Sequence, residues 1–165
     1  IEFIRLFSLA KVMYSGTLPS EDDLQINAEQ AGIHFESDGA SDHYGYSSIY
    51  EDTAMLFETT LMKYFYDADY EVAFTNLPGN PARCHVYIIT WGVKNRLGNI
   101  YVKPRAKFAV SELLPDLGLD VFFQNLELPV STMGNWCLAS AQTKSATSTQ
   151  TYKPIPPNDL IKPYL

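Results

Sequence analysis

The most informative segment of this chain spans residues 44–58 and reads Tyr44-Gly-Tyr-Ser-Ser-Ile-Tyr-Glu51-Asp-Thr-Ala-Met-Leu-Phe-Glu58. Ser48 and Glu51 have the spacing of a capping box, in which a serine hydroxyl accepts an amide hydrogen bond and a glutamate reaches back to the cap amide. Apolar residues then recur at helical spacing as far as Phe65. The segment therefore predicts a helix over residues 49–66 whose first turn carries two acids.

Two stripes follow from the helical spacing. The stripe expected to face the core contains Tyr50, Ala54, Phe57, Leu61, Tyr64 and Phe65. The second contains Glu51, Met55, Glu58 and Met62. Glu51 would then lie at the mouth of a packed helix, where it could hold a cation, although the helix dipole favours an acid there whatever the function. Glu58 lies about 10 Å further along the helix, too far to share a metal ion, and is predicted to be structural.

Tyr44-Gly45, followed by Glu51-Asp-Thr-Ala54, resembles the downstream half of the active site of gluzincin-type zinc metallopeptidases of the lethal-factor kind. In that family a Tyr-Gly loop leads into a helix that reads Glu-x-x-Ala. The resemblance implies that Glu51 is the third zinc ligand. It also implies that Tyr44, seven residues earlier, stabilises the oxyanion of the substrate carbonyl, with Tyr46 as the competing residue. Aromatic packing of the loop is the alternative role for both tyrosines.

The resemblance covers about fifteen of the 165 residues, and one half of the family's site is missing. These peptidases carry His-Glu-x-x-His on an upstream helix, with the two histidines on zinc and the glutamate as the base. The three histidines here, His34, His43 and His85, do not form that motif. Because the chain opens at Ile1 within a helical pattern, we expect it to be the C-terminal portion of a longer peptidase, inactive by itself.

Partners follow from this expectation. Zinc would bind only when an upstream segment or a companion chain supplies the histidines, and the substrate would be a peptide or protein. Asp52 is expected either to accept a proton from a zinc-bound imidazole or to be a solvated first-turn acid. His34 and His43 flank the loop and could line a substrate cleft, whereas His85 beside Cys84 has no companion ligands. The competing interpretation is a non-enzymatic helical binding or structural module, such as a degenerate peptidase.

Composition narrows the classes of partner. The net charge is −7 and the sequence pI is about 4.8, with no basic run, so nucleic acid and anionic lipid surfaces are poor candidates. No apolar run reaches the length of a membrane span. The two cysteines, Cys84 and Cys137, do not have zinc-knuckle spacing. A disulfide and two buried thiols both remain open, and the disulfide accords with a secreted or bacterial cell-envelope peptidase.

Other elements are predicted along the rest of the chain. We expect a helix from Ile1 to Tyr14 closed by Gly16, a second from Ser20 to Gly32, and a functional loop over 33–47. Extended structure follows around Val72 to Leu77, a break at 78–81, and then a buried helix over 85–97, although a strand also fits that β-branched run. Helices beginning near Pro104 and spanning about 116–126 complete a helical body over residues 1–128.

Residues 129–165 are rich in Ser, Thr and Pro and cannot bury a core of their own. They are predicted to form an extended tail over the surface of the body, with Trp136, Tyr152 and Tyr164 as anchors. The fold class expected for this chain is mainly α, a zincin-like C-terminal helical subdomain, and α+β for the whole catalytic domain.

Overall fold

The computed structural model describes residues 2–80 and 83–142 of the chain. The helices are α1 (Glu2–Ser15), α2 (Glu21–Leu24), α3 (Ala28–Glu36), α4 (Ile49–Tyr66), α5 (Val102–Leu113), α6 (Asp120–Gln124) and α7 (Trp136–Gln142). The strands are β1 (Glu71–Thr75), β2 (Ile88–Lys94), β3 (Val130–Ser131) and β4 (Gly134–Asn135). Short 3₁₀ helices are η1 (His43–Tyr46), η2 (Cys84–Val86), η3 (Arg96–Gly98) and η4 (Pro115–Leu117). The expectation of a mainly helical, α+β chain is confirmed at this level.

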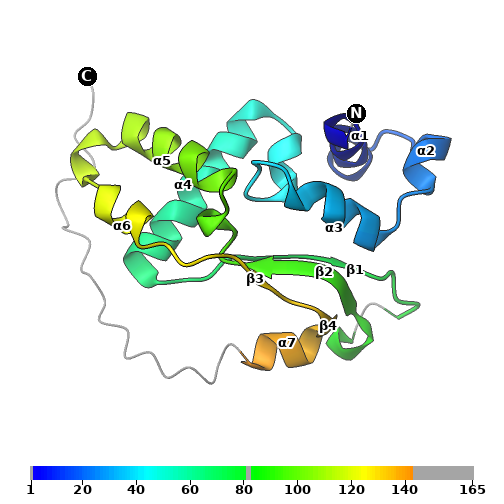
Figure 1. Ribbon diagram of the computed structural model, residues 1–165. Coiled ribbons are helices and arrows are strands. Elements are labelled where there is room, and N and C mark those ends of the chain that lie inside the picture. The colour runs from blue at the N-terminus through cyan, green and yellow to red at the C-terminus, as the bar shows by residue number, and fades with distance from the viewer. Residues whose placement is uncertain (1, 81–82, 143–165) are drawn as a thin grey trace.

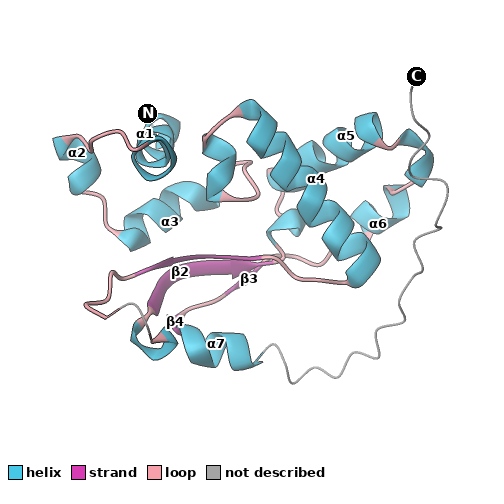
Figure 2. Cartoon of the chain, turned by 180° about the vertical axis from the view of Figure 1, so that it is seen from behind, coloured by secondary structure: helices cyan, strands magenta, loops and turns pink. Residues whose placement is uncertain are grey.

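The sheet is antiparallel and small. β2 pairs with β1 from Glu71↔Lys94 to Phe74↔Trp91, and its two ends pair with β3 and β4. In Figure 1, α1, α2 and α3 lie on one side of the sheet and α7 on the other, while α4, α5 and α6 form a group beside it. Figure 2 shows the same layers from behind.

Two apolar clusters hold these layers together. One joins α4, η3, α5 and α6 and contains Leu56, Leu97, Val102, Ala106, Ala109, Val110, Leu119 and Phe123. The other joins α1, α3, η1 and the sheet and contains Leu6, Ala10, Phe35, Ala40, Tyr46, Val72 and Val93. Helix α4 belongs to the first cluster through Leu56, and η1 belongs to the second through Tyr46, so the chain passes from one cluster to the other between these two residues.

Helix α4 has the predicted bounds. The Ser48 hydroxyl accepts the amide hydrogen bond of Glu51 at 3.1 Å, and the helix ends where Asp67 takes a left-handed conformation. The predicted core stripe is partly wrong, because Tyr50 is 83% exposed, and Leu56, Thr59 and Thr60 are buried instead. Each threonine hydroxyl donates to a backbone carbonyl four residues earlier, at 2.7 Å. Satisfied in this way, a threonine can be buried without an unpaired hydroxyl.

The predicted second helix is wrong, because the chain forms α2 and α3 instead. Asn27 caps α3 by accepting from the amide of Gln30. Gly32 does not end the helix. It lies inside α3 directly beneath Trp91, where an added Cβ would be 2.3 Å from the indole ring. Gly32 is therefore a packing residue that lets α3 approach β2, and α3 continues to Glu36 into the predicted loop.

The helix predicted over 85–97 is wrong as well. The same residues form η2, strand β2 and η3, and β2 is the central strand of the sheet. A strand covered on both faces has a continuous apolar run rather than an alternating one, so its pattern is not distinguishable from that of a buried helix. The helix predicted at Pro104 is confirmed as α5, whereas the one over 116–126 shortens to α6 after Gly118 adopts a positive φ.

The structure also differs from the predicted tail. Residues 130–142 form β3, β4 and α7, and Trp136 lies beside Tyr87 with ring centroids 6.5 Å apart. Residues 143–165, with Tyr152 and Tyr164, lie outside the described residues. Cys137 of α7 is bonded to Cys84 of η2, with the Cα atoms 5.6 Å apart, and this disulfide resolves the alternative that the sequence left open.

Thiol titration checks the disulfide. Unreduced, denatured protein is expected to show no reactive thiol, and reduced protein two. Because the bridge closes a loop of 53 residues, breaking it by Cys84→Ser is expected to lower the free energy of unfolding by about 2–4 kcal/mol. Two reactive thiols before reduction would contradict the bridge.

Candidate functional site

Glu51 lies on the first turn of α4, directly after the Tyr44-Gly45 segment that forms η1. Its backbone is fixed by the Ser48 cap, and its side chain is half-buried. Within the described residues, its carboxylate has no hydrogen bond or ion pair. The cap fixes the Glu51 backbone. The glutamate does not reach back to the Ser48 amide as the predicted capping box requires, so both its carboxylate oxygens are without a partner among the described residues.

Asp52, the second acid of that turn, is fully engaged. Its carboxylate forms a short two-point ion pair with Arg105 of α5, whose Nη1 also donates to the carbonyl of Gly39 at 2.6 Å. Gly45 lies against it, since a Cβ there would be 3.0 Å from the Asp52 carboxylate. A side chain at this position would therefore push the Asp52 carboxylate by a few tenths of an ångström. Asp52 holds α5, α4 and the loop together, and this pairing supports neither of its expected roles.

The two loop tyrosines have different environments. Tyr46 is 6% exposed, and its hydroxyl donates a short hydrogen bond to the Asp38 carboxylate. Burial, followed by that bond, raises the pKa of Tyr46 well above its ordinary value. Tyr44 is 36% exposed, and its ring packs edge-on against Tyr14 of α1 at 4.7 Å. Tyr44, with no hydroxyl hydrogen bond to a described residue, is the better candidate for contact with a substrate.

The buried Asp42 carboxylate accepts hydrogen bonds that hold the loop in place. It is 4% exposed and accepts hydrogen bonds from the Tyr44 amide and the Tyr70 hydroxyl, each at 2.6 Å. His43 Nδ1 lies 3.3 Å from the same carboxylate. Burial of Asp42 opposes ionisation, but the contacts with His43, Tyr70 and the Tyr44 amide outweigh it and lower the pKa of Asp42. The carboxylate is therefore ionised, and it joins the first residues of η1 to Tyr70 at the approach to β1.

Asp42→Asn is expected to lower the free energy of unfolding at neutral pH by about 1.5–3 kcal/mol, since its hydrogen bonds are to a charged acceptor. Because the folded-state pKa is depressed, this stabilisation is present above the unfolded-state pKa and is lost as the pH falls through the folded-state value. The difference in the free energy of unfolding between wild type and Asp42→Asn should therefore become smaller below about pH 4. Urea unfolding at pH 7, 5 and 3 measures it, with exposed Asp22→Asn as the control. A difference in the free energy of unfolding that does not change with pH would show that the ionised form of Asp42 is not what stabilises the fold.

The histidines are dispersed. His34 lies in α3, His43 in η1 and His85 on the exposed η2. Across residues 2–80 and 83–142, no group of three or more His, Cys, Asp or Glu side chains is arranged to hold a metal ion. The described residues therefore do not complete a zinc site by themselves, and Glu51 could supply one ligand of such a site.

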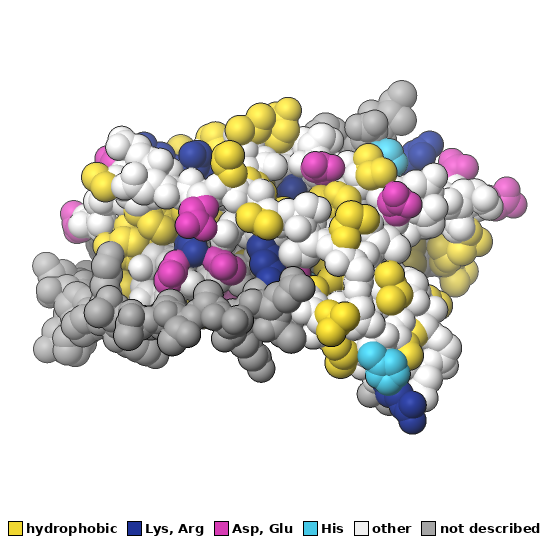
Figure 3. Space-filling model, turned by 60° about the horizontal axis from the view of Figure 1, so that its bottom comes forward, with side chains coloured by type: hydrophobic (Ala, Val, Ile, Leu, Met, Phe, Trp, Pro, Cys, Tyr) yellow, Lys and Arg dark blue, Asp and Glu magenta, His cyan; other side chains and the backbone are white. Residues whose placement is uncertain are grey.

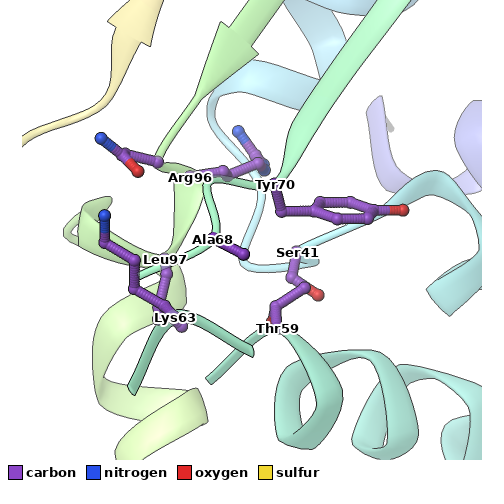
Figure 4. A pocket seen from close by; sticks show the side chains of 8 residues that line it. Ser41, Thr59, Lys63, Ala68, Tyr70, Arg96 and Leu97 are labelled. Atoms are coloured by element: carbon purple, nitrogen blue, oxygen red, sulfur yellow. The ribbon is translucent and has the colours of Figure 1, made fainter. Parts of the chain in front are cut away.

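A small cavity lies behind the loop (Figure 4). Side chains converge on it from the loop before η1 (Ser41), from α4 (Thr59, Lys63) and from η3 (Arg96, Leu97). Its volume is about 10 Å³, the size needed for one water molecule. Ser41 is 2% exposed, and its hydroxyl has no hydrogen-bond partner among the described residues. The cavity is too small for an organic ligand.

One face of the described residues can be inspected for clusters of basic side chains. On the face shown in Figure 3, acidic, basic and hydrophobic side chains of the described residues are interspersed, and the basic ones do not gather into one patch. Among the helices that the structure describes, none combines the length and the apolar character needed to cross a bilayer.

Comparisons with protein-family profiles, with curated proteins and with solved structures find no match to this chain. The class of protein is therefore inferred from the arrangement of residues in the loop before α4 and in the first turn of α4. Sequence spacing brought together Tyr44, Ser48 and Glu51, but it missed Asp42, Arg96 and Arg105. Arg105 is paired with Asp52, which is 53 residues away in the chain. A contact between residues so far apart leaves no local pattern in a single sequence.

Proposed function

We propose that this chain is the C-terminal portion of a zinc-dependent metallopeptidase with a zincin-like helical subdomain. Glu51 would be the carboxylate zinc ligand, and Tyr44 would donate a hydrogen bond to the oxyanion. The observation that carries the proposal is the state of Glu51, which is held on a capped first turn without a described partner, whereas its neighbour Asp52 is ion-paired.

The zinc ligands of the proposed site would be divided between this chain and a second segment. A gluzincin site joins two imidazoles and one carboxylate and leaves a fourth position for water. Zinc bound there supplies a water of lowered pKa and polarises the peptide carbonyl. The imidazoles and the general base would come from an upstream segment or companion chain, since the described histidines do not provide them.

The loop supplies the remaining group. Tyr44 keeps its phenol partly exposed, while its ring is packed on Tyr14 and its amide is held by Asp42. A donor fixed in this way loses little freedom when it binds a developing negative charge. Tyr46, the competing residue, already donates to Asp38 and would have to break that bond.

The disulfide supports an oxidising compartment for the peptidase, as in secreted or cell-envelope proteins. The alternative function is a non-enzymatic helical module, favoured by the structural roles of Asp42 and Asp52. Zinc content and turnover of a longer protein that includes the histidine segment separate the two functions.

Tyr44→Phe in that longer protein is expected to lower turnover by about 10²-fold while leaving the zinc content unchanged, because it removes only an oxyanion donor. Peptide hydrolysis and metal analysis of the same preparations measure both. Tyr50→Phe, on an 83% exposed ring of α4, is the matched control and should leave turnover unchanged. Equal turnover in wild type and Tyr44→Phe would remove Tyr44 from the mechanism.

A further inference from the structure

A groove lies where α1, the loop between α3 and η1, and the first turns of α4 and α5 come together. Its volume is about 420 Å³, within the range typical of small-ligand sites. Its charged lining residues are Asp38 of the loop, Asp52 of α4 and Arg105 of α5. The groove is therefore large enough for a side chain of another molecule, and its charges decide which kind.

The Asp38 carboxylate is connected to both the aromatic and the charged parts of the groove. Its Oδ2 accepts a short hydrogen bond from the Tyr46 hydroxyl, and the Tyr46 ring packs edge-on against Phe7 with the ring centroids 5.3 Å apart. Its Oδ1 accepts from the Gly39 amide at 2.6 Å. The Gly39 carbonyl in turn accepts from Arg105 Nη1 at 2.6 Å. Asp38 is thus joined to the Tyr46–Phe7 pair directly and to Arg105 through Gly39.

The charges in and behind the groove do not cancel. Both donors to the Asp38 carboxylate are uncharged, and Arg105 is ion-paired with Asp52. Arg96, behind the groove, donates to the backbone carbonyl of Asp38 at 2.9 Å, and Glu36 is a further acid whose charge acts on Arg96. Three carboxylates against two guanidinium groups leave one negative charge. The groove therefore favours a cation, and Asp38 is the acid left to receive it.

The acceptor positions that remain on Asp38 indicate the kind of cation. An ionised carboxylate has about four acceptor positions on its two oxygens, and one protein donor already occupies each oxygen. A free position on each oxygen fits the two parallel N–H groups of a guanidinium better than the single point charge of an ammonium. The Phe7 ring, 47% exposed, offers an apolar wall to the methylene stem of such a side chain.

We propose that this groove binds an arginine side chain of a peptide, with the guanidinium on the Asp38 carboxylate and the methylene stem against Phe7. The net charge of −7 favours basic peptides as partners of this chain. The inference goes beyond the proposed function, since it names a second binding site and uses neither Glu51 nor Tyr44.

The test is an NMR titration of the ¹⁵N-labelled 165-residue chain with N-acetylargininamide. N-acetylcitrullinamide is the matched control probe, because citrulline replaces the guanidinium by an uncharged urea group of nearly the same shape. The arginine probe is expected to shift the amides of Gly39, Gly45 and Arg105 and to bind at least about fivefold more tightly than the citrulline probe. N-acetyllysinamide, which has the charge without the planar fork, is expected to bind with an affinity between the two.

Charge variants locate the binding. Asp38→Asn removes the charge with little change of shape and is expected to weaken the arginine probe by about fivefold. Asp22→Asn, at an exposed acid of α2 outside the groove, is the matched control and should leave the affinity unchanged. Ser37→Lys places a cation at an exposed position of the groove and should also weaken the arginine probe, whereas Ser37→Gln should not. This second pair keeps the test decisive if Asp38→Asn does not fold.

Three results would overturn the proposal. The first is a citrulline or lysine probe that binds as tightly as the arginine probe. The second is equal affinity for the arginine probe in wild type and in the folded Asp38→Asn or Ser37→Lys variant. The third is the lack of shifts in the groove at about 20 mM probe, which detects dissociation constants in the millimolar range.

The titration contains no zinc, so its outcome is separate from that of the zinc assignment. A longer protein without zinc would reject the peptidase and leave the arginine site in place. Failure of the titration would reject the arginine site and leave the zinc ligand to its own test.

Discussion

Replacing Arg96 by alanine is expected to lower the free energy of unfolding by about 3–5 kcal/mol. Arg96 is 2% exposed, and its guanidinium donates to the carbonyls of Phe35, Ala40 and Asp38 at 2.5, 2.7 and 2.9 Å. It also lies 3.7 Å above the centre of the Phe35 ring. Alanine would leave these carbonyls without their donor and open a cavity in their place.

The charge of Arg96 is retained at neutral pH. Burial lowers its pKa to about 10, so that the guanidinium stays protonated throughout the physiological range. Because it joins the end of α3 and the loop before η1 to the turn after β2, its loss should also loosen the loop that carries Tyr44. Arg96→Lys is expected to recover only part of the stability, since an ammonium lacks the planar fork that serves three carbonyls.

Urea unfolding of wild type, Arg96→Ala and Arg96→Lys measures the effect. Arg5→Ala, on the exposed side of α1, is the control and should change the free energy of unfolding by less than about 0.5 kcal/mol. A loss below about 1 kcal/mol in Arg96→Ala would show that the buried guanidinium is not what orders this loop.

Helix α4 was predictable because its signals are local. A serine cap, first-turn acids and a long apolar repeat all lie within residues 48–66, and the helix has those bounds. Which face is buried was not predictable in the same way. Tyr50 is exposed while Thr59 and Thr60 are buried, since packing against α5 and η3 in the first cluster, rather than hydrophobicity alone, decides which side of α4 is covered.

The errors elsewhere have tertiary causes. Gly32 has the sequence signature of a helix end, but its missing side chain makes room for Trp91, which is 59 residues away in the chain. The run from Ile88 to Lys94 is a strand because β1, β3 and β4 pair with it, and that pairing is not encoded within the run itself. In both places the deciding partner is distant in sequence.

Only some residues of the candidate site were predictable from the sequence, again according to whether the deciding partner is near or distant in the chain. Spacing identifies Tyr44 and Glu51, which lie within one loop and one helix turn, and the burial and hydrogen bond of Tyr46 then leave Tyr44 as the more accessible of the two tyrosines in the proposed role of oxyanion donor. The residues that hold this segment come from elsewhere: Tyr70 at the approach to β1, and Arg105 on α5. Long-range hydrogen bonds of this kind leave no periodic pattern, so a single sequence does not reveal them.

The central claim is that Glu51 is a zinc ligand, and Glu51→Gln in a longer protein that includes the histidine segment tests it most directly. The amide is nearly isosteric but uncharged, so zinc occupancy is expected to fall sharply while the Ser48 cap, which uses the Glu51 backbone, is retained. Glu58→Gln, on an exposed residue of the same stripe, is the matched control and should keep its zinc.

The decisive measurement is the zinc content of the three purified proteins, determined by elemental analysis after removal of loosely bound metal, with circular dichroism as the check on folding. We expect about one zinc per chain in wild type and in Glu58→Gln, and a large loss in folded Glu51→Gln. Equal zinc in wild type and Glu51→Gln, or no zinc in any of the three, would contradict the ligand assignment and leave the chain as a non-enzymatic module.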